Sequence, residues 1–321
     1  MKKLLALGLV AAAVLAVGFW FIQGWNGAGP SKRPTPVVIE SGTSLAKAAE
    51  QLEKAGVIAS SERFLFQARI FGSGEPIKAG EYAFPARASH SQVLSLLQDA
   101  KTLQRMLTIP EGLPSVLVHE RLMNAPTLVG EVPVPEEGSV LPNSYSYQRG
   151  EARSAVLARM QAAMARTLAD LWAKRAPTAV VTSPREAVIL ASIVEKETGK
   201  ASERRMVAGV YSNRLRIGMK LDADPTVIYP VTKGRPLGRR IKQSELRANN
   251  GYNTYAMAGL PAGPIANPGR DSIAAVLNPA PTEAIYFVAD GTGGHVFANS
   301  FAEHQANVEK WRAIRRARGE M

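Results

Sequence analysis

The sequence predicts an α+β protein built in three successive parts: a single N-terminal apolar helix, a small α/β module, and a larger mixed α+β domain. Two observations predict this division. A long run without charges opens the chain and is followed by a segment rich in Gly, Pro and Ser. Beyond that segment, short strand-like stretches alternate with capped helical stretches. At 321 residues the chain is long enough for one or two domains with cores of their own.

The N-terminal run starts after Lys2 and Lys3 and stays uncharged over residues 4–22. This length is sufficient to span a membrane. The run ends in aromatic residues rather than at a small-residue cleavage site, which favours an uncleaved anchor over a signal peptide. Because both lysines precede the run, we expect a cytoplasmic N-terminus with everything after the run outside. Residues 1–22 are therefore predicted to be a cytoplasmic stub and a single transmembrane helix.

Residues 23–36 are predicted to be a flexible linker, and residues 37–100 a small module. The module begins with a strand at 37–39 and a helix whose apolar residues share one face. A second strand near 81–84 and a helix from about Ser91 follow. Strand, turn and short helix in this order resemble a LysM-like module, a fold that often binds N-acetylated glycans. A packing module without a ligand is the alternative, because a fold alone does not establish a function.

Residues 101–321 are predicted to form the larger domain. Its predicted elements are an amphipathic helix over 152–175, an apolar helix over 184–198, an irregular loop over 252–269, a β-hairpin around a turn at 290–294, and a last helix to about 318. The apolar helix has the clearest boundaries. Ser183 is a suitable N-cap, with Pro184 at N1 and Glu186 at N3, and Gly199 follows the predicted end.

Two glutamates at the end of this helix are the main candidates for chemistry. At about 100° per residue, Glu195 and Glu197 lie roughly 200° apart around the axis and cannot act side by side. Glu197 continues the apolar ridge that contains Ile193, so its carboxyl should lose water and its pKa should rise, as a general acid requires. A structural ion pair with Arg204 or Arg214 is the alternative for Glu197. Glu195 is the second candidate.

Other candidates lie further along the chain. Asp224 precedes a proline, which is typical of a turn or a helix start, and it is also a possible supporting carboxylate. The Gly- and Pro-rich loop that follows can present amides and ring faces to a sugar, or its residues can simply pack the loop. Its candidates for substrate binding are Tyr252, Asn253, Thr254 and Tyr255.

Composition excludes several other classes of site. The chain contains no cysteine, and its four histidines show no ligand spacing, so we expect no metal site. The net charge of +12 is compatible with nucleic acid. The predicted export of the chain argues against that partner and favours anionic lipid headgroups or cell-wall carboxylates.

The chain resembles the endolytic murein transglycosylases, the YceG-like or MltG family, in several ordered blocks. These blocks are ASIVEKET at 191–198, SER at 202–204, VYSNRLRIGMKLDADPTVIY at 210–229, YNTYAMAGLPAGPIANPG at 252–269, and YFVADGTGGHVFANSFAEH at 286–304. The resemblance implies a periplasm-facing lyase of the bacterial inner membrane. Such an enzyme cuts the bond between N-acetylmuramic acid (MurNAc) and N-acetylglucosamine (GlcNAc) within nascent peptidoglycan strands, leaves 1,6-anhydroMurNAc ends, and so terminates strand elongation.

The resemblance also implies roles for individual residues. Glu197 would be the acid and then the base, with Glu195 or Asp224 as possible supporting groups, and no metal or organic cofactor would be needed. The implied partners are peptidoglycan glycan strands, the inner membrane and peptidoglycan synthases, with no nucleic acid. Two alternatives remain: a hydrolytic muramidase with Asp224 or Glu137 as its second carboxylate, and a membrane-tethered, non-catalytic peptidoglycan-binding scaffold.

Overall fold

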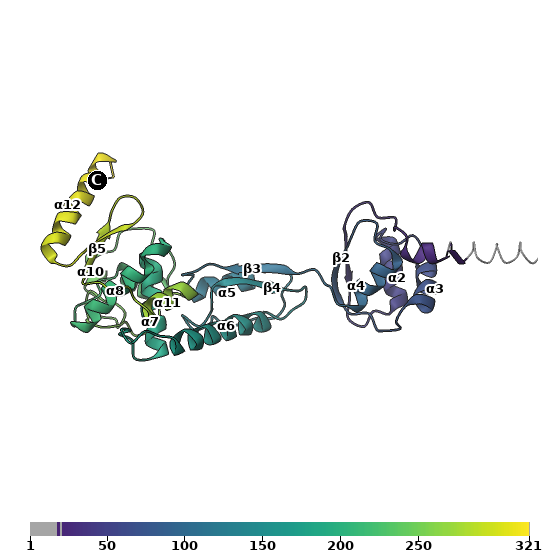
Figure 1. Ribbon diagram of the computed structural model, residues 1–321, viewed down its shortest axis with the longest axis horizontal. Coiled ribbons are helices and arrows are strands. Elements are labelled where there is room, and N and C mark those ends of the chain that lie inside the picture. The colour runs from purple at the N-terminus through teal and green to yellow at the C-terminus, as the bar shows by residue number, and fades with distance from the viewer. Residues whose placement is uncertain (1–17, 20, 321) are drawn as a thin grey trace, which may run out of the picture. The chain divides into compact units, whose positions relative to one another are not determined.

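The computed structural model describes residues 18, 19 and 21–320 and divides the chain into two compact units (Figure 1). The first unit ends at Arg105 and includes Ser146–Glu151, and the second comprises Met106–Tyr145 and the chain from Ala152 onward. Most of the predicted transmembrane run lies outside the described residues. Within the described part, no helix combines the length and apolar character needed to cross a membrane. The domain boundaries inferred from the sequence stay predictions.

The first unit is a two-stranded antiparallel sheet covered by helices. Its strands are β1 (Thr35–Ile39) and β2 (Gly80–Phe84), and its helices are α2 (Leu45–Lys54), α3 (Ser61–Phe71) and α4 (His90–Gln98). Each helix begins after a serine whose hydroxyl accepts a hydrogen bond from a backbone N–H of the first turn: Ser44, Ser60 and Ser89. The structure confirms both predicted strands and two of the helices, and α3 is an addition.

The second unit is mainly helical and carries two further two-stranded sheets. Its first sheet pairs β3 (Arg105–Ile109) with β4 (Asn143–Tyr147), and its second pairs β5 (Tyr286–Ala289) with β6 (His295–Ala298). Its helices are α5 (Ser115–Met123), α6 (Arg153–Ala173), α7 (Pro184–Glu197), the 3-10 turn η1 (Ala201–Glu203), α8 (Arg204–Arg216), α9 (Asp224–Thr232), α10 (Gln243–Leu246), α11 (Arg270–Leu277) and α12 (Phe301–Ala317). The predicted mixed α+β class is therefore confirmed.

Helix α7 lies at the centre of the second unit, among α6, α8, α9 and α11 (Figure 1). Its residues from Ala187 to Val194 are all buried, which explains why the sequence is apolar around the whole helix rather than on one stripe. The N-terminus is capped as predicted, with the Ser183 hydroxyl accepting from the backbone N–H of Glu186. The C-terminus differs from the prediction. Thr198 ends the helix in an extended conformation, and Gly199 does not adopt a left-handed conformation.

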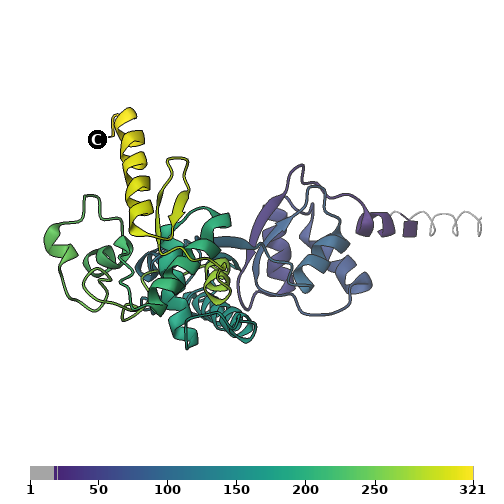
Figure 2. The same ribbon diagram turned by 60° about the vertical axis from the view of Figure 1, so that its left-hand side comes forward.

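The C-terminal hairpin and helix lie side by side (Figure 2). Strands β5 and β6 pair in register, with Tyr286 opposite Ala298 and Ala289 opposite His295. Helix α12 begins after Ser300, whose hydroxyl accepts from the N–H of Glu303. Both elements confirm the sequence prediction, because alternation and a capping pattern are local signals.

Candidate active site

Glu197 is the last residue of α7, and its carboxyl is largely withdrawn from water. Its Oε1 atom is buried and has no hydrogen-bond partner among the described residues. Burial and the nearby Asp224 carboxylate raise the pKa of Glu197 to about 7, while the Tyr211 hydroxyl and the Arg214 guanidinium oppose this rise. Near neutral pH, a substantial fraction of this carboxyl therefore carries a proton that it can donate.

No ion pair neutralises Glu197 within the described part of the chain. Arg214 donates to backbone carbonyl oxygens instead, at 2.6 Å to Ile285 and 2.7 Å to Leu221. Arg204 contacts other carboxylates, with Nη2 2.8 Å from Oε2 of Glu111. The geometry thus favours a desolvated carboxyl at Glu197 that forms no ion pair, and not the structural ion pair that the sequence left open.

Glu195 lies on the other side of α7 and has structural partners. Its Oε2 accepts a 2.8 Å hydrogen bond from the backbone N–H of Gly269, the residue before α11, and its Oε1 lies 3.5 Å from Nη2 of Arg204. The side chain is 5% exposed. Because both oxygens have partners, Glu195 fastens α11 and α8 to the end of α7. This arrangement favours Glu197 over Glu195 as the acid.

Asp224 is the first residue of α9, as its position before a proline predicted, and its carboxylate is exposed to solvent. Oδ1 accepts a hydrogen bond of 2.7 Å from the Tyr255 hydroxyl. The Asp224 charge also acts on Glu197. The structure therefore brings Glu197, Asp224 and Tyr255 together, although they come from three separate segments of the chain.

The four loop candidates divide into two pairs. Asn253 is buried and its amide donates to three backbone carbonyls, those of Glu245, Leu246 and Ala248. Thr254 is also buried and accepts at its hydroxyl from the N–H of Ala223. These contacts favour the loop-packing interpretation for Asn253 and Thr254.

The two tyrosines of the loop are only partly buried. The ring of Tyr252 lies 5.1 Å from that of Tyr229, and Tyr255 reaches Asp224. Partly exposed aromatic rings next to carboxylates are suited to contact with a sugar. Tyr252 and Tyr255 therefore remain the candidates for substrate binding.

Glu137, the other carboxylate considered for a hydrolase, has a structural environment. Its Oε1 accepts from the backbone N–H of Ser115, the first residue of α5, at 2.9 Å and from Nδ2 of Asn267 at 3.2 Å. Burial raises the pKa of Glu137, and the Ser115 bond and the Tyr229 hydroxyl oppose the rise. The carboxyl joins α5 to the segment before α11, which leaves Asp224 as the better-placed second carboxylate.

Two contacts near the end of α7 were not anticipated from the sequence. Tyr211 on α8 is 1% exposed and lies beside Glu197. Its signal was a hydroxyl on the buried face of a helix, because a buried tyrosine normally has a polar partner. Glu203 is the second, since its Oε2 lies 2.8 Å from Nδ1 of His295 and its Oε1 3.1 Å from Nζ of Lys200. These contacts tie the hairpin to the turn that follows α7.

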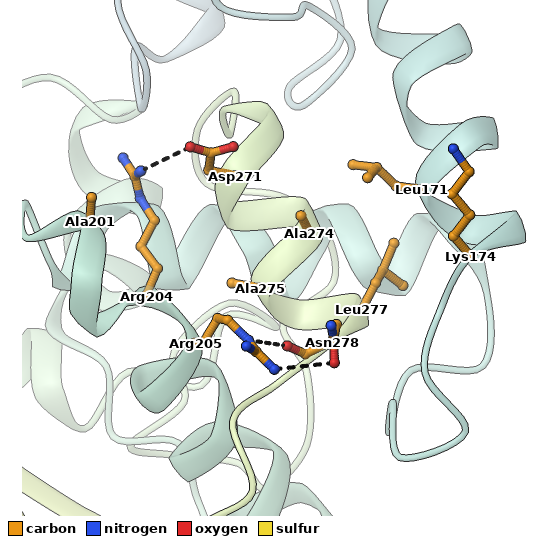
Figure 3. Close-up of a pocket in the computed structure, with 10 residues that line it drawn as sticks. All are labelled: Leu171, Lys174, Ala201, Arg204, Arg205, Asp271, Ala274, Ala275, Leu277 and Asn278. Atoms are coloured by element: carbon orange, nitrogen blue, oxygen red, sulfur yellow. Dashed lines mark hydrogen bonds and ion pairs between the residues drawn. The ribbon is translucent and has the colours of Figure 1, made fainter.

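A separate pocket of about 430 Å³ lies between α6, α8 and α11 (Figure 3). Arg204 and Asp271 lie on one side of it, with Arg205 bonded to Asn278 below. Glu197 and Asp224 do not line this pocket. The pocket lies on the Glu195 side of α7, because Arg204 both lines the pocket and contacts Glu195. As for metals, the described residues contain no group of three or more His, Asp or Glu side chains that could hold an ion.

Fold and site together define an α+β protein in which a buried helix ends in an unpaired carboxyl with a raised pKa. The chain belongs to the YceG-like family, whose model matches residues 37–310. It is 28% identical over 327 residues to the endolytic murein transglycosylase of Streptococcus pneumoniae, an alignment that covers 87% of this chain and 58% of that protein. It is 37% identical over 129 residues to the endolytic murein transglycosylase of Bacillus subtilis, covering 40% of this chain and 35% of the relative.

A solved structure shows the same fold. The crystal structure of a YceG-like protein from Listeria monocytogenes superimposes with a TM-score of 0.53 at 26% identity, covering 86% of this chain and 99% of the other. The chain spans 58% of the length of the Streptococcus relative. The chain therefore shares both the family and the fold of the YceG-like proteins.

Proposed function

We propose that this protein is an endolytic lytic transglycosylase that cleaves the MurNAc–GlcNAc bond within nascent peptidoglycan strands. The observation that carries the proposal is the buried carboxyl of Glu197, which forms no ion pair among the described residues and whose pKa of about 7 provides a proton donor near neutral pH. The names of the Streptococcus and Bacillus relatives support the same activity. Release of a strand from within would terminate its elongation.

The reaction needs one acid that becomes a base. Glu197 donates its proton to the glycosidic oxygen while the bond to C1 of the muramyl residue breaks. The resulting carboxylate then takes the proton from the 6-hydroxyl of the same sugar as that oxygen bonds to C1. The product is a 1,6-anhydroMurNAc end, and no water is consumed. General acid–base catalysis contributes about 10²–10⁴-fold, so stabilisation of the cationic transition state must supply more.

Asp224 is placed to provide that stabilisation. Its carboxylate is exposed, is held by Tyr255, and acts on Glu197 through its charge. A negative charge near the reacting carbon favours an oxocarbenium-like transition state. The same observation supports a hydrolytic muramidase as the second candidate, because Asp224 could instead activate water as the base of a two-carboxylate mechanism.

The cellular setting is also proposed. The uncharged run over residues 4–22 would anchor the chain in the bacterial inner membrane, with the catalytic unit in the periplasm. The first unit would serve as a LysM-like module that holds glycan, and peptidoglycan synthases would be partners because they produce the strand. The support for the module is its separate core, built around the β1–β2 sheet.

Mass spectrometry of reaction products tests the proposal. The full chain in detergent is incubated with uncrosslinked glycan strands, in parallel with Glu197→Gln and Glu195→Gln. Internal fragments with 1,6-anhydromuramyl ends, lost only in a folded Glu197→Gln protein, are expected. Reducing ends would identify a hydrolase. Strands that are bound but stay intact would identify a non-catalytic scaffold, and loss of activity in Glu195→Gln alone would move the acid to Glu195.

A further inference from the structure

Within the first unit, helix α3 carries an exposed apolar surface. Three large side chains of α3 lie on it: Phe66 is 56% exposed, Ile70 is 53% exposed and Phe71 is 40% exposed. The opposite side of α3 packs into the core through Phe64 and Ala68. The outer side of α3 therefore exposes large apolar side chains next to the charged Glu62 and Arg69, although a helix at a water-exposed surface normally carries mainly polar residues on its outer side.

The helical residues that precede the linker extend this surface. The Phe21 ring lies 5.4 Å from the Phe66 ring and 5.7 Å from the Phe71 ring, and the Trp25 ring lies 5.8 Å from the Phe71 ring. Nε2 of Gln67 donates to the carbonyl oxygen of Phe21 at 3.1 Å. The N-terminal segment is thus fastened along α3.

Two more side chains of this segment remain exposed, Phe19 at 66% and Ile22 at 52%. We call the surface formed by Phe66, Ile70 and Phe71 the outer α3 face; Phe19 and Ile22 are exposed on the adjoining N-terminal segment. Several large apolar side chains exposed on one small unit indicate an interaction surface, because leaving them in water forgoes the free energy of burying them.

The sequence indicates which kind of partner suits this face. The uncharged run over residues 4–22 ends beside this face, because Phe21 packs against Phe66, so the proposed membrane anchor is directly continuous with this part of the first unit. Phenylalanine and tryptophan rings are concentrated here, and such rings are typical of the membrane–water interface. Arg69 is exposed one turn after Phe66 on α3, where its guanidinium can reach lipid phosphates.

We propose that the outer α3 face docks on the lipid bilayer, so that the first unit lies against the membrane surface instead of hanging free on a linker. The inference rests on the proposed membrane anchor and goes beyond it, because an anchor alone leaves the orientation of the first unit open. Docking would hold the β1–β2 sheet and its helices at the height where nascent strands leave the membrane.

The absence of cysteine from the chain allows a direct test. A single cysteine is introduced at Ile70→Cys on the face, or at Lys47→Cys on the exposed side of α2 as the matched control. Each full-length protein is labelled with the environment-sensitive fluorophore NBD and reconstituted in vesicles of phosphatidylethanolamine and phosphatidylglycerol. Emission is recorded with and without lipids that carry a quencher near the headgroup.

The proposal expects a shift of the emission at position 70 to shorter wavelength and quenching by the lipid-borne quencher, with neither effect at position 47. If both proteins stay out of the vesicles, the anchor and the docking are overturned together. If both enter the vesicles but position 70 behaves like position 47, the anchor stands and the docking is overturned. A shift at position 70 without lipid quenching would show that a second copy covers the face instead.

A second variant tests whether the fluorophore at position 70 enters the bilayer by its own affinity for lipid. Phe66→Asp places a charge in the centre of the face, and since the side chain is more than half exposed the core of the first unit is left intact. In this background the labelled position 70 should lose its quenching while the protein remains in the vesicles. Retained quenching would contradict docking through this face. Strand cleavage is not part of either readout, so failure of the proposed enzyme activity would be recognised separately.

Discussion

The Tyr255 hydroxyl donates a hydrogen bond of 2.7 Å to Oδ1 of Asp224 and thereby joins the loop after α10 to the start of α9. The loop is fixed at its base by Thr254, whose hydroxyl lies 2.9 Å from that of Thr226 on α9. Asp224 in turn favours the protonated form of Glu197. Contacts between three segments therefore set the charge around the candidate acid.

Tyr255→Phe should reduce kcat about tenfold, because a lost hydrogen bond to a charged group costs about 1.5–3 kcal/mol and part of that loss is screened at this exposed position. The measurement is the rate of anhydromuropeptide release. If Tyr255 acts through Asp224, the double variant with Asp224→Asn should be no slower than Asp224→Asn alone. Additive losses would instead show an independent role in binding the sugar.

Substitutions at the two glutamates of α7 should separate activity from stability. Glu197→Gln should lower the cleavage rate by about 10²–10⁴-fold while the protein stays folded, because Oε1 has no hydrogen-bond partner and the amide can still accept from the Tyr211 hydroxyl. Glu195→Gln should lower the free energy of unfolding by about 1.5–3 kcal/mol, because it weakens the bonds to Gly269 and Arg204. Urea unfolding measures the second effect. Equal destabilisation by both changes would contradict this division of roles.

The pH dependence of stability should carry the signature of Glu197. The pKa of Glu197 is about 7 in the folded protein, above the ordinary value of 4.5 that applies to the unfolded chain. Between pH 4.5 and 7 the folded protein therefore holds a proton on this carboxyl that the unfolded chain has released. The free energy of unfolding should therefore fall as pH rises from about 4.5 to 7, by about 3 kcal/mol at most. Comparison with Glu197→Gln isolates this contribution, since the amide does not titrate. Identical pH profiles for the two proteins would mean that the carboxyl is solvated.

The pH dependence of activity should follow the same group. Cleavage requires the protonated carboxyl, so kcat should decline above about pH 7 as Glu197 ionises. Asp224→Asn removes the charge that favours protonation, and should move this alkaline limb to lower pH. Initial rates across a pH series measure both. If the alkaline limb of the Asp224→Asn profile coincides with that of the unmodified protein, burial alone raises the pKa of Glu197.

Glu203→Gln should loosen the C-terminal hairpin. Burial by itself would raise the pKa of Glu203, but the hydrogen bonds from His295 and Lys200 outweigh it and hold the pKa below its usual value. The amide weakens both contacts, and amide hydrogen exchange over β5 and β6 should accelerate while exchange in α7 is unchanged. Glu309→Gln is the control, because its exposed pair with Arg312 lies within one turn of α12. Faster exchange in both variants would indicate general destabilisation.

Local signals predicted individual elements well. Helix α7 begins where Ser183, Pro184 and Glu186 place it, and β5 and β6 flank the predicted Gly-rich turn. Several other elements were not predicted, among them helix α3, and for α9 only a turn or helix start at Asp224 was predicted. In α3 the exposed Phe66 and Ile70 add apolar residues outside the buried side, so the sequence has no clear helical stripe. In α9 two prolines obscure the pattern.

The sequence by itself determined the apolar, capped helix that ends in two glutamates, and the opposite directions in which these glutamates point. Both follow from the period of an α-helix, which is a local property of the chain. Only the tertiary structure decided their partners: Gly269 and Arg204 for Glu195, and the burial of Glu197 beside Tyr211 and Asp224. These partners come from α8, α9 and the segment before α11. Their approach depends on long-range packing, which the periodicity of one segment does not encode.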